Sequence, residues 1–168
     1  MDVFEAVRTL LAVRSYQDTP VPAEAVHQIV EAGRLTASGM NAQPWHFIVI
    51  ENRDTLRALG QLARTGPYIA QAPLAIVVAI AKTPLAVSDA SRAIQSMLLT
   101  GWAKGLGSNW VGFSKLDPIK DLLGIPADLD VLAVLPFGYP SGDIGKGKKQ
   151  RKPLGEVASR ERFGQPYE

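Results

Sequence analysis

Residues 37–46 hold the side chains best suited to binding a small molecule. Ser38, Asn41 and Gln43 provide hydrogen-bond donors and acceptors, and Gly39 lets the backbone approach a ligand closely. A flat heteroaromatic ring with carbonyl and N–H groups would suit this set. The same polar residues can instead cap a loop by bonding their own backbone. Taken alone, these residues favour the capped loop over the ligand site.

The chain has little acid–base or nucleophilic machinery of its own. It contains no cysteine, which excludes disulfides, thiolate metal sites and cysteine nucleophiles. We interpret its two histidines, His27 and His46, as a surface and a structural histidine rather than a metal site. Neither a G-x-S-x-G turn nor a Walker A sequence is present. If the chain is an enzyme, we therefore expect a bound cofactor to carry the chemistry.

Residues 105–110, Gly-Leu-Gly-Ser-Asn-Trp, begin like a dinucleotide-binding fingerprint but do not complete it. Trp110 stands in place of the third glycine. The segment also ends an expected helix and enters a strand, whereas the fingerprint needs a strand followed by a helix. We therefore expect no nucleotide site of that kind here.

The elements that must position these residues follow from hydrophobic periodicity. The expected helices cover residues 2–12, 22–36, 54–64, 89–104 (with Ser88 as N-cap) and a short stretch between Asp117, as N-cap, and Gly124. The expected strands cover residues 45–51, 74–81, 108–113 and 131–137. These strands are apolar enough for burial on both faces, which predicts three layers with a central sheet.

Length and composition fit one ordinary globular domain. The chain has 168 residues, of which 46% are hydrophobic and 20% charged. Its longest apolar run, residues 74–81, is far shorter than a membrane span. Asp2 and Glu5 stand where a signal peptide is basic, so we expect none. These features predict a cytoplasmic protein without a membrane partner.

The end of the chain, residues 138–168, does not predict independent folding. It carries five cations, which are Lys146, Lys148, Lys149, Arg151 and Lys152. Composition alone favours a solvated tail over a phosphate or nucleic-acid site, and no aromatic residue lies between the cations to stack on bases. Apolar residues such as Leu154 and Phe163 follow, so packing on a partner subunit and disorder are equally favoured.

Several stretches of the chain occur in the order found in one enzyme family. The most specific is Asn-Ala-Gln-Pro-Trp-His-Phe-Ile-Val-Ile at residues 41–50, which follows an expected helix. Others lie at residues 4–7, 13–14, 18–22, 29–34, 105–112, 123–126, 138–140 and 149–157. The last of them is a basic segment followed by Pro-Leu-Gly-Glu-Val. With these stretches the chain resembles the FMN-dependent nitroreductase family over nearly its whole length.

The resemblance implies an α+β fold, with a central mixed β-sheet flanked by helices in three layers. It implies one domain over residues 1–168, two copies of which interlock as a homodimer and build two FMN sites at their interface. Residues from about 138 to 168 would form a C-terminal extension on the partner subunit. The implied cofactor-binding residues are Arg14, Ser38, Gly39, Asn41, Gln43, Val111, Gly112, Lys149 and Arg151.

These residues have different implied roles. Those at positions 38–43 would reach the flavin from the neighbouring subunit, and the backbone of Val111 or Gly112 would donate near flavin N5. Lys149 and Arg151 would hold the phosphate.

The chain departs from the family in one place. The family's Arg-Arg-Ser-x-Arg pattern falls on residues 10–14, where only the last arginine, Arg14, is present. Charge-assisted hydrogen bonds contribute roughly 1.5–3 kcal/mol each. We therefore expect an altered phosphate pocket, in which Arg14, Lys149 and Arg151 compensate, and a related flavin or a deazaflavin becomes an alternative to FMN. Arg8 could also compensate, but we interpret it as a solvated surface arginine.

The implied activity is a ping-pong reaction between two small molecules. NAD(P)H would pass a hydride to the flavin, and a nitroaromatic, quinone or enone would then accept it. We expect no side chain to act as an obligatory acid or base. Trp45, Trp102, Trp110 and Phe113 can line such a pocket, although we interpret each as plain core.

Two other functions stay open from the sequence. One is a flavoprotein of the same fold with different chemistry, such as dehalogenation, dehydrogenation or flavin fragmentation. The other is a nucleic-acid-binding module that uses the basic run, which would bind with a steep salt dependence. We favour the reductase without a nucleic-acid partner. The sequence chooses neither the acceptor nor between NADH and NADPH.

Overall fold

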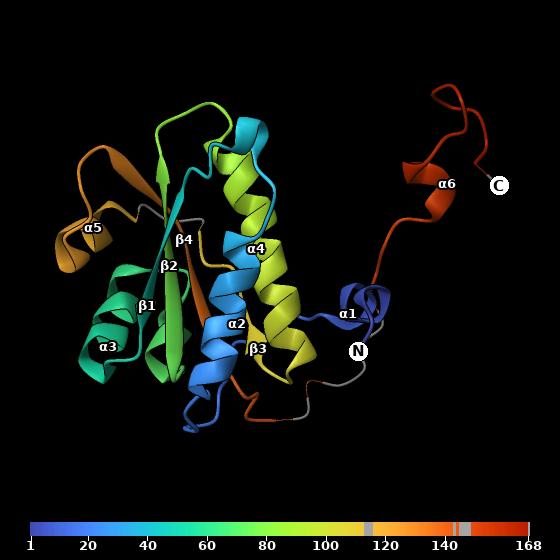
Figure 1. Ribbon diagram of the computed structural model, residues 1–168. Coiled ribbons are helices and arrows are strands. Elements are labelled where there is room, and N and C mark those ends of the chain that lie inside the picture. Colours follow the sequence, from blue (N-terminus) through green and yellow to red (C-terminus); the bar gives the residue numbers. More distant parts are fainter. Residues whose placement is uncertain (113–115, 143, 145–148, 168) are drawn as a thin grey trace.

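A central antiparallel sheet organises the molecule (Figure 1). The structure is a computed structural model that describes residues 1–112, 116–142, 144 and 149–167. Within these residues the sheet has four strands, in the spatial order β1 (Trp45–Ile50), β2 (Leu74–Ala81), β4 (Leu129–Gly138) and β3 (Gly107–Ser108). All three neighbouring pairs are antiparallel. The mixed character expected of the sheet is limited to a parallel bridge between Ala12 and Ser108 at the β3 edge.

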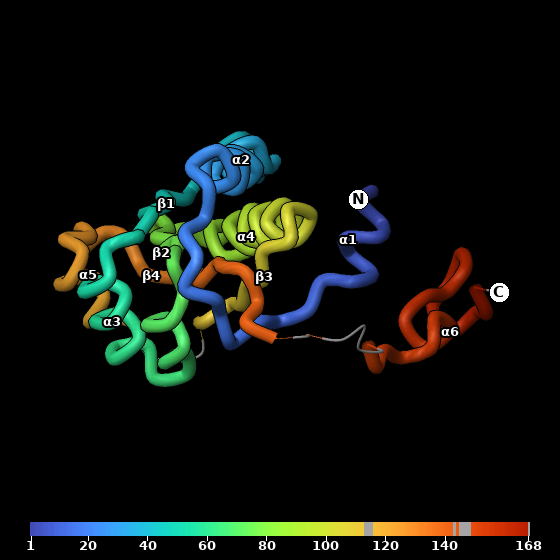
Figure 2. Tube along the Cα trace, turned by 90° about the horizontal axis from the view of Figure 1, so that it is seen from below, coloured from blue at the N-terminus to red at the C-terminus, as the bar shows by residue number. Residues whose placement is uncertain are grey.

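Helices cover both faces of the sheet, so the α+β fold in three layers is confirmed (Figure 2). One face carries α2 (Ala23–Arg34) and α4 (Ala86–Ala103), and the other carries α3 (Arg53–Leu62) and α5 (Asp117–Leu123). Two short 3-10 helices, η1 (Gly39–Asn41) and η2 (Pro67–Gln71), precede β1 and β2 respectively.

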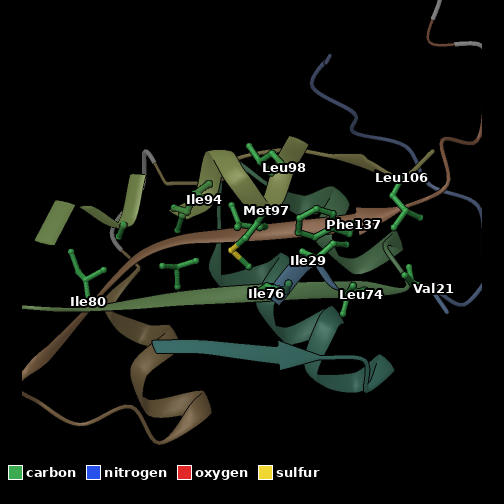
Figure 3. Close-up of a cluster of buried hydrophobic side chains, with 14 of the residues drawn as sticks. Val21, Ile29, Leu74, Ile76, Ile80, Ile94, Met97, Leu98, Leu106 and Phe137 are labelled. Carbon is green, nitrogen blue, oxygen red and sulfur yellow. The ribbon is translucent and has the colours of Figure 1, made fainter. Parts of the chain in front are cut away.

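Strand β2 lies between two hydrophobic cores. Its even-numbered residues, Leu74 to Ile80, pack with α2 and α4, where Ile29, Ile94 and Met97 are fully buried (Figure 3). Its odd-numbered residues pack with α3 and α5 on the opposite face. Since successive strand residues point to opposite faces, a run without polar residues is what a central strand needs. Full burial of such a side chain contributes roughly 1.5–3 kcal/mol.

The expected helices are present, but their ends differ. Helix α1 (Val3–Thr9) ends before residue 12, because Ala12 and Val13 pair with Ser108 beside the sheet. Helix α4 begins three residues early, from a turn in which the Ala86 N–H donates to Thr83 O, so Ser88 is not its cap. Pro22 and Leu116 are the N-caps of α2 and α5, one residue from the expected position. Gly124 lies just past the end of α5, as expected, and has a left-handed φ angle of 65°.

Two strands also differ from expectation. Strand β1 is an edge strand whose residues are only partly buried, apart from Ile50, and His46 is exposed rather than structural. Strand β3 is shorter than the expected 108–113, because after Ser108 the chain returns to β4 only at the Val111–Val134 bridge. Phe113 lies outside the described residues.

Residues 149–167, the C-terminal arm, extend away from the body beyond α1 (Figures 1 and 2). The arm contains the short helix α6 (Leu154–Val157) and exposes Leu154, Val157 and Phe163. Helix α1 likewise exposes Val3 and Phe4. An extended segment with exposed large apolar side chains is typical of a surface that packs on another chain.

Candidate functional site

Residues 38–43, the polar loop, hold an unusual backbone shape. Met40, Asn41 and Gln43 have left-handed φ angles of 51°, 55° and 47°. Each non-glycine residue in that region costs roughly 1–3 kcal/mol, and such strain concentrates at functional sites. Both interpretations of this loop, as a self-capped loop and as a ligand site, have support. The Gln43 side chain donates to Asn41 O (3.2 Å), as in a self-capped loop. The exposed Asn41 side chain forms no hydrogen bond to another described residue.

Hydrogen bonds hold the polar loop both within itself and to the body. Within the loop, the Gln43 N–H donates to Ser38 Oγ at 2.9 Å. Between the loop and the body, the Gly39 N–H donates to both carboxylate oxygens of Asp89, at 3.2 and 3.1 Å. Asp89 lies in the first turn of α4, is only 1% exposed, and pairs with Arg92 one turn later. Sequence reasoning missed Asp89, since an acid in a helix's first turn is an ordinary feature.

The strand-end residues Val111 and Gly112 lie beside β4. The Val111 N–H donates to Val134 O (3.0 Å), and its carbonyl accepts from Val134 (2.9 Å). The Val111 amide is thus used within the sheet, and of the two expected donors Gly112 is the one left as a candidate. A Cβ atom on Gly112 would stand 2.9 Å from Leu132 O and 2.5 Å from Trp110 Nε1, so this position accepts no side chain without a shift.

Lys149 is the centre of a group of cations that we call the cation cluster, with Arg8 and Arg151. Its Nζ donates to Val7 O on α1 at 2.7 Å. Burial lowers the pKa of Lys149, and the positive charges of Arg151 and Arg8 lower it further. Three like charges within electrostatic range form a place where an anion is favoured. Lys146 and Lys148 lie outside the described residues.

Arg8 meets the expectation of a surface arginine only in part. Its side chain is 61% exposed and forms a two-point ion pair with Glu5, with both N···O distances at 2.8 Å. Its charge nevertheless acts on Lys149, 141 positions along the chain. The path of the C-terminal arm past α1 creates this proximity, and no local pattern around Arg8 indicates it.

Arg14 lies apart from that cluster, at the β3 edge of the sheet. It follows Val13, whose N–H donates to Ser108 O, and precedes Tyr16, which bridges to Pro140. Burial and the nearby Tyr68 raise the pKa of the Tyr16 phenol, while the positive charge of Arg14 opposes this shift.

Helix α4 separates the polar loop from the cation cluster (Figure 1). Its first turn holds the loop through Asp89, whereas near its last turn Trp102 Nε1 donates to Thr9 Oγ1 of α1 at 2.8 Å. Lys149 is bound to the same helix α1 through Val7 O. An α-helix rises 1.5 Å per residue, so the 18 residues of α4 span roughly 27 Å. One chain therefore does not bring the two groups together around one small ligand.

The remaining candidates have structural roles. The Trp45 and Phe47 rings stack with centroids 6.2 Å apart, and Trp45 and Trp110 both pack against the α2–α4 core. Among residues 1–112, 116–142, 144 and 149–167, no group of three or more His, Cys, Asp or Glu side chains is placed to hold a metal ion. Nor does any helix in this part of the chain have the length and apolar character to cross a membrane.

Comparison with known proteins gives a consistent assignment. The profile of the Nitroreductase family matches residues 11–83 and 63–139. An NADH dehydrogenase/NAD(P)H nitroreductase from Methanothermobacter thermautotrophicus is 36% identical over 154 residues, covering 86% of this chain and 81% of the relative. An iodotyrosine deiodinase from Thermotoga neapolitana is 24% identical over 189 residues, covering 94% and 96%. The crystal structure of a Desulfovibrio desulfuricans nitroreductase in complex with FMN has a TM-score of 0.84 at 31% identity, covering 97% and 98%. The chain therefore belongs to the Nitroreductase family of oxidoreductases.

Proposed function

We propose that this protein is an FMN-dependent oxidoreductase that acts as a homodimer and uses NAD(P)H to reduce a small organic acceptor. The observation that carries the proposal is the cation cluster, in which Lys149 Nζ donates to Val7 O of α1 at 2.7 Å, beside Arg8, with Arg151 two positions further along the arm. A phosphate group would relieve the mutual repulsion of these cations and accept their hydrogen bonds. The family relative that was solved with FMN supports this choice of ligand.

The residues of this chain fit a flavin as well as a phosphate. Gly112 lies at the proposed ring edge, and its backbone is packed so closely that a Cβ there would meet Trp110 and Leu132. Asn41 presents its amide at the surface of the polar loop. When bound, FMN supplies the redox chemistry, with NAD(P)H as donor and the organic acceptor as oxidant. The protein itself binds and orients the ring, and Gly112 N–H is the proposed donor to its edge.

A homodimer places the two halves of the site around one ligand. The polar loop and the cation cluster lie near opposite ends of α4, whose 18 residues span roughly 27 Å. In a symmetric dimer the loop of one protomer can meet the cation cluster of its partner. The exposed apolar residues of the C-terminal arm and of α1 supply a surface for such an interface. Arg14, Lys149 and Arg151 would then come from one protomer, and Ser38, Gly39, Asn41 and Gln43 from the other.

A different reaction on the same cofactor is the second candidate. The deiodinase from Thermotoga neapolitana covers nearly the whole chain at 24% identity, so reductive dehalogenation is compatible with this family. The two candidates differ in the acceptor and share the bound flavin. They are separated by offering the reduced protein a nitroaromatic, a quinone, an enone and an iodinated phenol under anaerobic conditions.

The cofactor itself is tested by the visible spectrum of the purified protein. We expect the absorption bands of oxidised flavin, release of FMN on denaturation, bleaching by NADH or NADPH, and elution as a dimer on gel filtration. A protein that stays colourless after incubation with excess FMN, or that elutes as a monomer while binding FMN tightly, would contradict the proposal. Binding to DNA or RNA that weakens steeply as the salt concentration rises would favour the nucleic-acid-binding alternative.

A further inference from the structure

The polar loop is too strained to hold its shape unaided. Three non-glycine residues with left-handed φ angles lie within four positions, at Met40, Asn41 and Gln43. Such a segment keeps this conformation only if its surroundings fix it. Packing within the chain does not do so, since Met40 is 93% exposed and Asn41 is exposed as well. The contact between Ser38 and Gln43 lies inside the loop, so it closes the loop without fixing it to the body.

Asp89 is the group that fixes the loop to the body. Both of its carboxylate oxygens accept from Gly39 N–H, and hydrogen bonds to an ionised acceptor are about twice as strong as neutral ones. Arg92 and the first turn of α4 stabilise the negative charge of this buried group. Helix α4 is in turn held by the core through Ile94 and Met97. The carboxylate therefore joins a strained surface loop to a rigid element.

Gly39 lies close to the start of α4 on the side of this contact. A Cβ atom at this position would stand 2.8 Å from Leu85 Cδ1 and 3.7 Å from Asp89 Oδ2. The backbone of the loop thus lies directly against the start of α4. Leu85 is 48% exposed, so its side chain can be shortened without opening a cavity in the core.

We propose that Asp89 is a positioning residue for the flavin, and that it preorganises the polar loop for the ring bound at the partner's cation cluster. This inference rests on the proposed function, because it takes the ligand to be a flavin. Asp89 is buried, whereas Met40 and Asn41 in the loop that it orders are exposed. The ordered surface therefore faces outward, where another molecule can bind it. A loop held in its binding shape loses less conformational freedom when the ligand arrives, which strengthens binding.

The test compares FMN and riboflavin, which share the ring and differ in the phosphate. Dissociation constants are measured by fluorescence titration of the flavin-free dimer. We expect Asp89→Ala to weaken both ligands by the same factor, about 10- to 100-fold, since a charge-assisted contact is lost on the ring side only. Asp89→Asn, which keeps an acceptor of the same size, should recover part of the affinity. Lys149→Ala should weaken FMN alone, and Ser88→Ala, an exposed neighbour, should change neither.

A second set of variants tests the geometry without removing a buried charge. Gly39→Ala should weaken both flavins by a few-fold only, because the new methyl group must displace the half-exposed end of the Leu85 side chain, and Leu85→Ala should restore binding in the double variant. Leu85→Ala alone should bind like the wild type. Wild-type affinity in both Asp89→Ala and Gly39→Ala would overturn the inference while the proposed function stood. A wild-type protein that binds no flavin would instead refute the proposed function.

Discussion

The polar loop and the cation cluster are built on opposite physical principles, although we propose that they hold the same ligand. Backbone geometry defines the loop, since three left-handed residues are tied to α4 through a carboxylate that is almost fully buried. Charge defines the cluster, since Lys149 donates to one backbone carbonyl and has the positive charges of Arg8 and Arg151 nearby. The polar loop is therefore ordered but strained in its backbone, whereas the cations of the cluster repel one another.

This difference teaches which part of a ligand each region can recognise. A rigid loop with fixed donors and acceptors discriminates the shape and polar edge of a ring. Exposed cations on long side chains attract any suitably placed phosphate, and salt screens the long-range part of that attraction. Ring recognition should therefore depend on packing and on the Gly39 contact, whereas phosphate recognition should depend on ionic strength and pH.

The sharpest break between the two regions is expected from removing the cations. The double variant Lys149→Ala/Arg151→Ala should weaken FMN by about 100- to 10,000-fold, because each charge-assisted contact contributes roughly 1.5–3 kcal/mol. Riboflavin affinity should stay within a factor of about two, since it has no phosphate. Fluorescence titration measures both constants. An equal loss for the two ligands would mean that these cations act on the ring or on the fold.

Mixing subunits tests whether the two regions of one site come from different chains. An Asp89→Ala chain and a Lys149→Ala/Arg151→Ala chain are unfolded together, refolded and titrated with FMN. If the proposed dimer forms at random, about a quarter of the sites should regain wild-type affinity, since each heterodimer combines one intact loop with one intact cation cluster. Refolding either variant with itself is the control. No recovery in a sample shown to contain heterodimers would place both regions of a site in one protomer.

The sequence predicts the scaffold better than the contacts that cross it. Strand β2 was predicted with correct ends, because a run that is apolar on both faces has few alternatives. The start of α4 was predicted three residues late. A backbone turn at Thr83 begins the helix, whereas the local N-cap signal is Ser88. Strand β3 was overestimated, because after Ser108 the ladder is interrupted and only Val111 pairs with β4 again.

The same limit applies to the candidate site. Ser38, Gly39, Asn41 and Gln43 share one short segment, so their types and spacing were visible. Asp89 was invisible because its partner lies 50 positions away and its own surroundings are those of an ordinary helix start. Contacts between distant segments depend on the path of the chain, which local patterns do not encode.

Replacing Gly112 sharpens the comparison from the ring side. Gly112→Ala should weaken FMN and riboflavin alike, by about 10-fold or more, because a methyl group must displace Trp110 or the backbone at Leu132. Gly142→Ala is a matched control, since a Cβ there meets nothing within 4 Å. Circular dichroism and the melting temperature of the flavin-free protein show whether the sheet edge persists. A selective loss of FMN, with riboflavin unchanged, would remove Gly112 from the ring site.

The smallest expected effect concerns pH and the cation cluster. Burial and the charges of Arg151 and Arg8 lower the pKa of Lys149, so in the flavin-free protein this lysine loses its proton at a lower pH than a free lysine does. Only the protonated form pairs well with phosphate, so FMN affinity should fall as pH rises through that pKa. Riboflavin affinity should not follow it. The variant Arg8→Ala removes one repelling charge, so the pKa of Lys149 should rise. The decline in FMN affinity should then move to higher pH. At neutral pH the affinity for FMN should fall a few-fold, because a nearby cation is lost. If the decline lies at the same pH in Arg8→Ala as in the wild type, Arg8 does not act on Lys149, and the cation cluster reduces to Lys149 and Arg151.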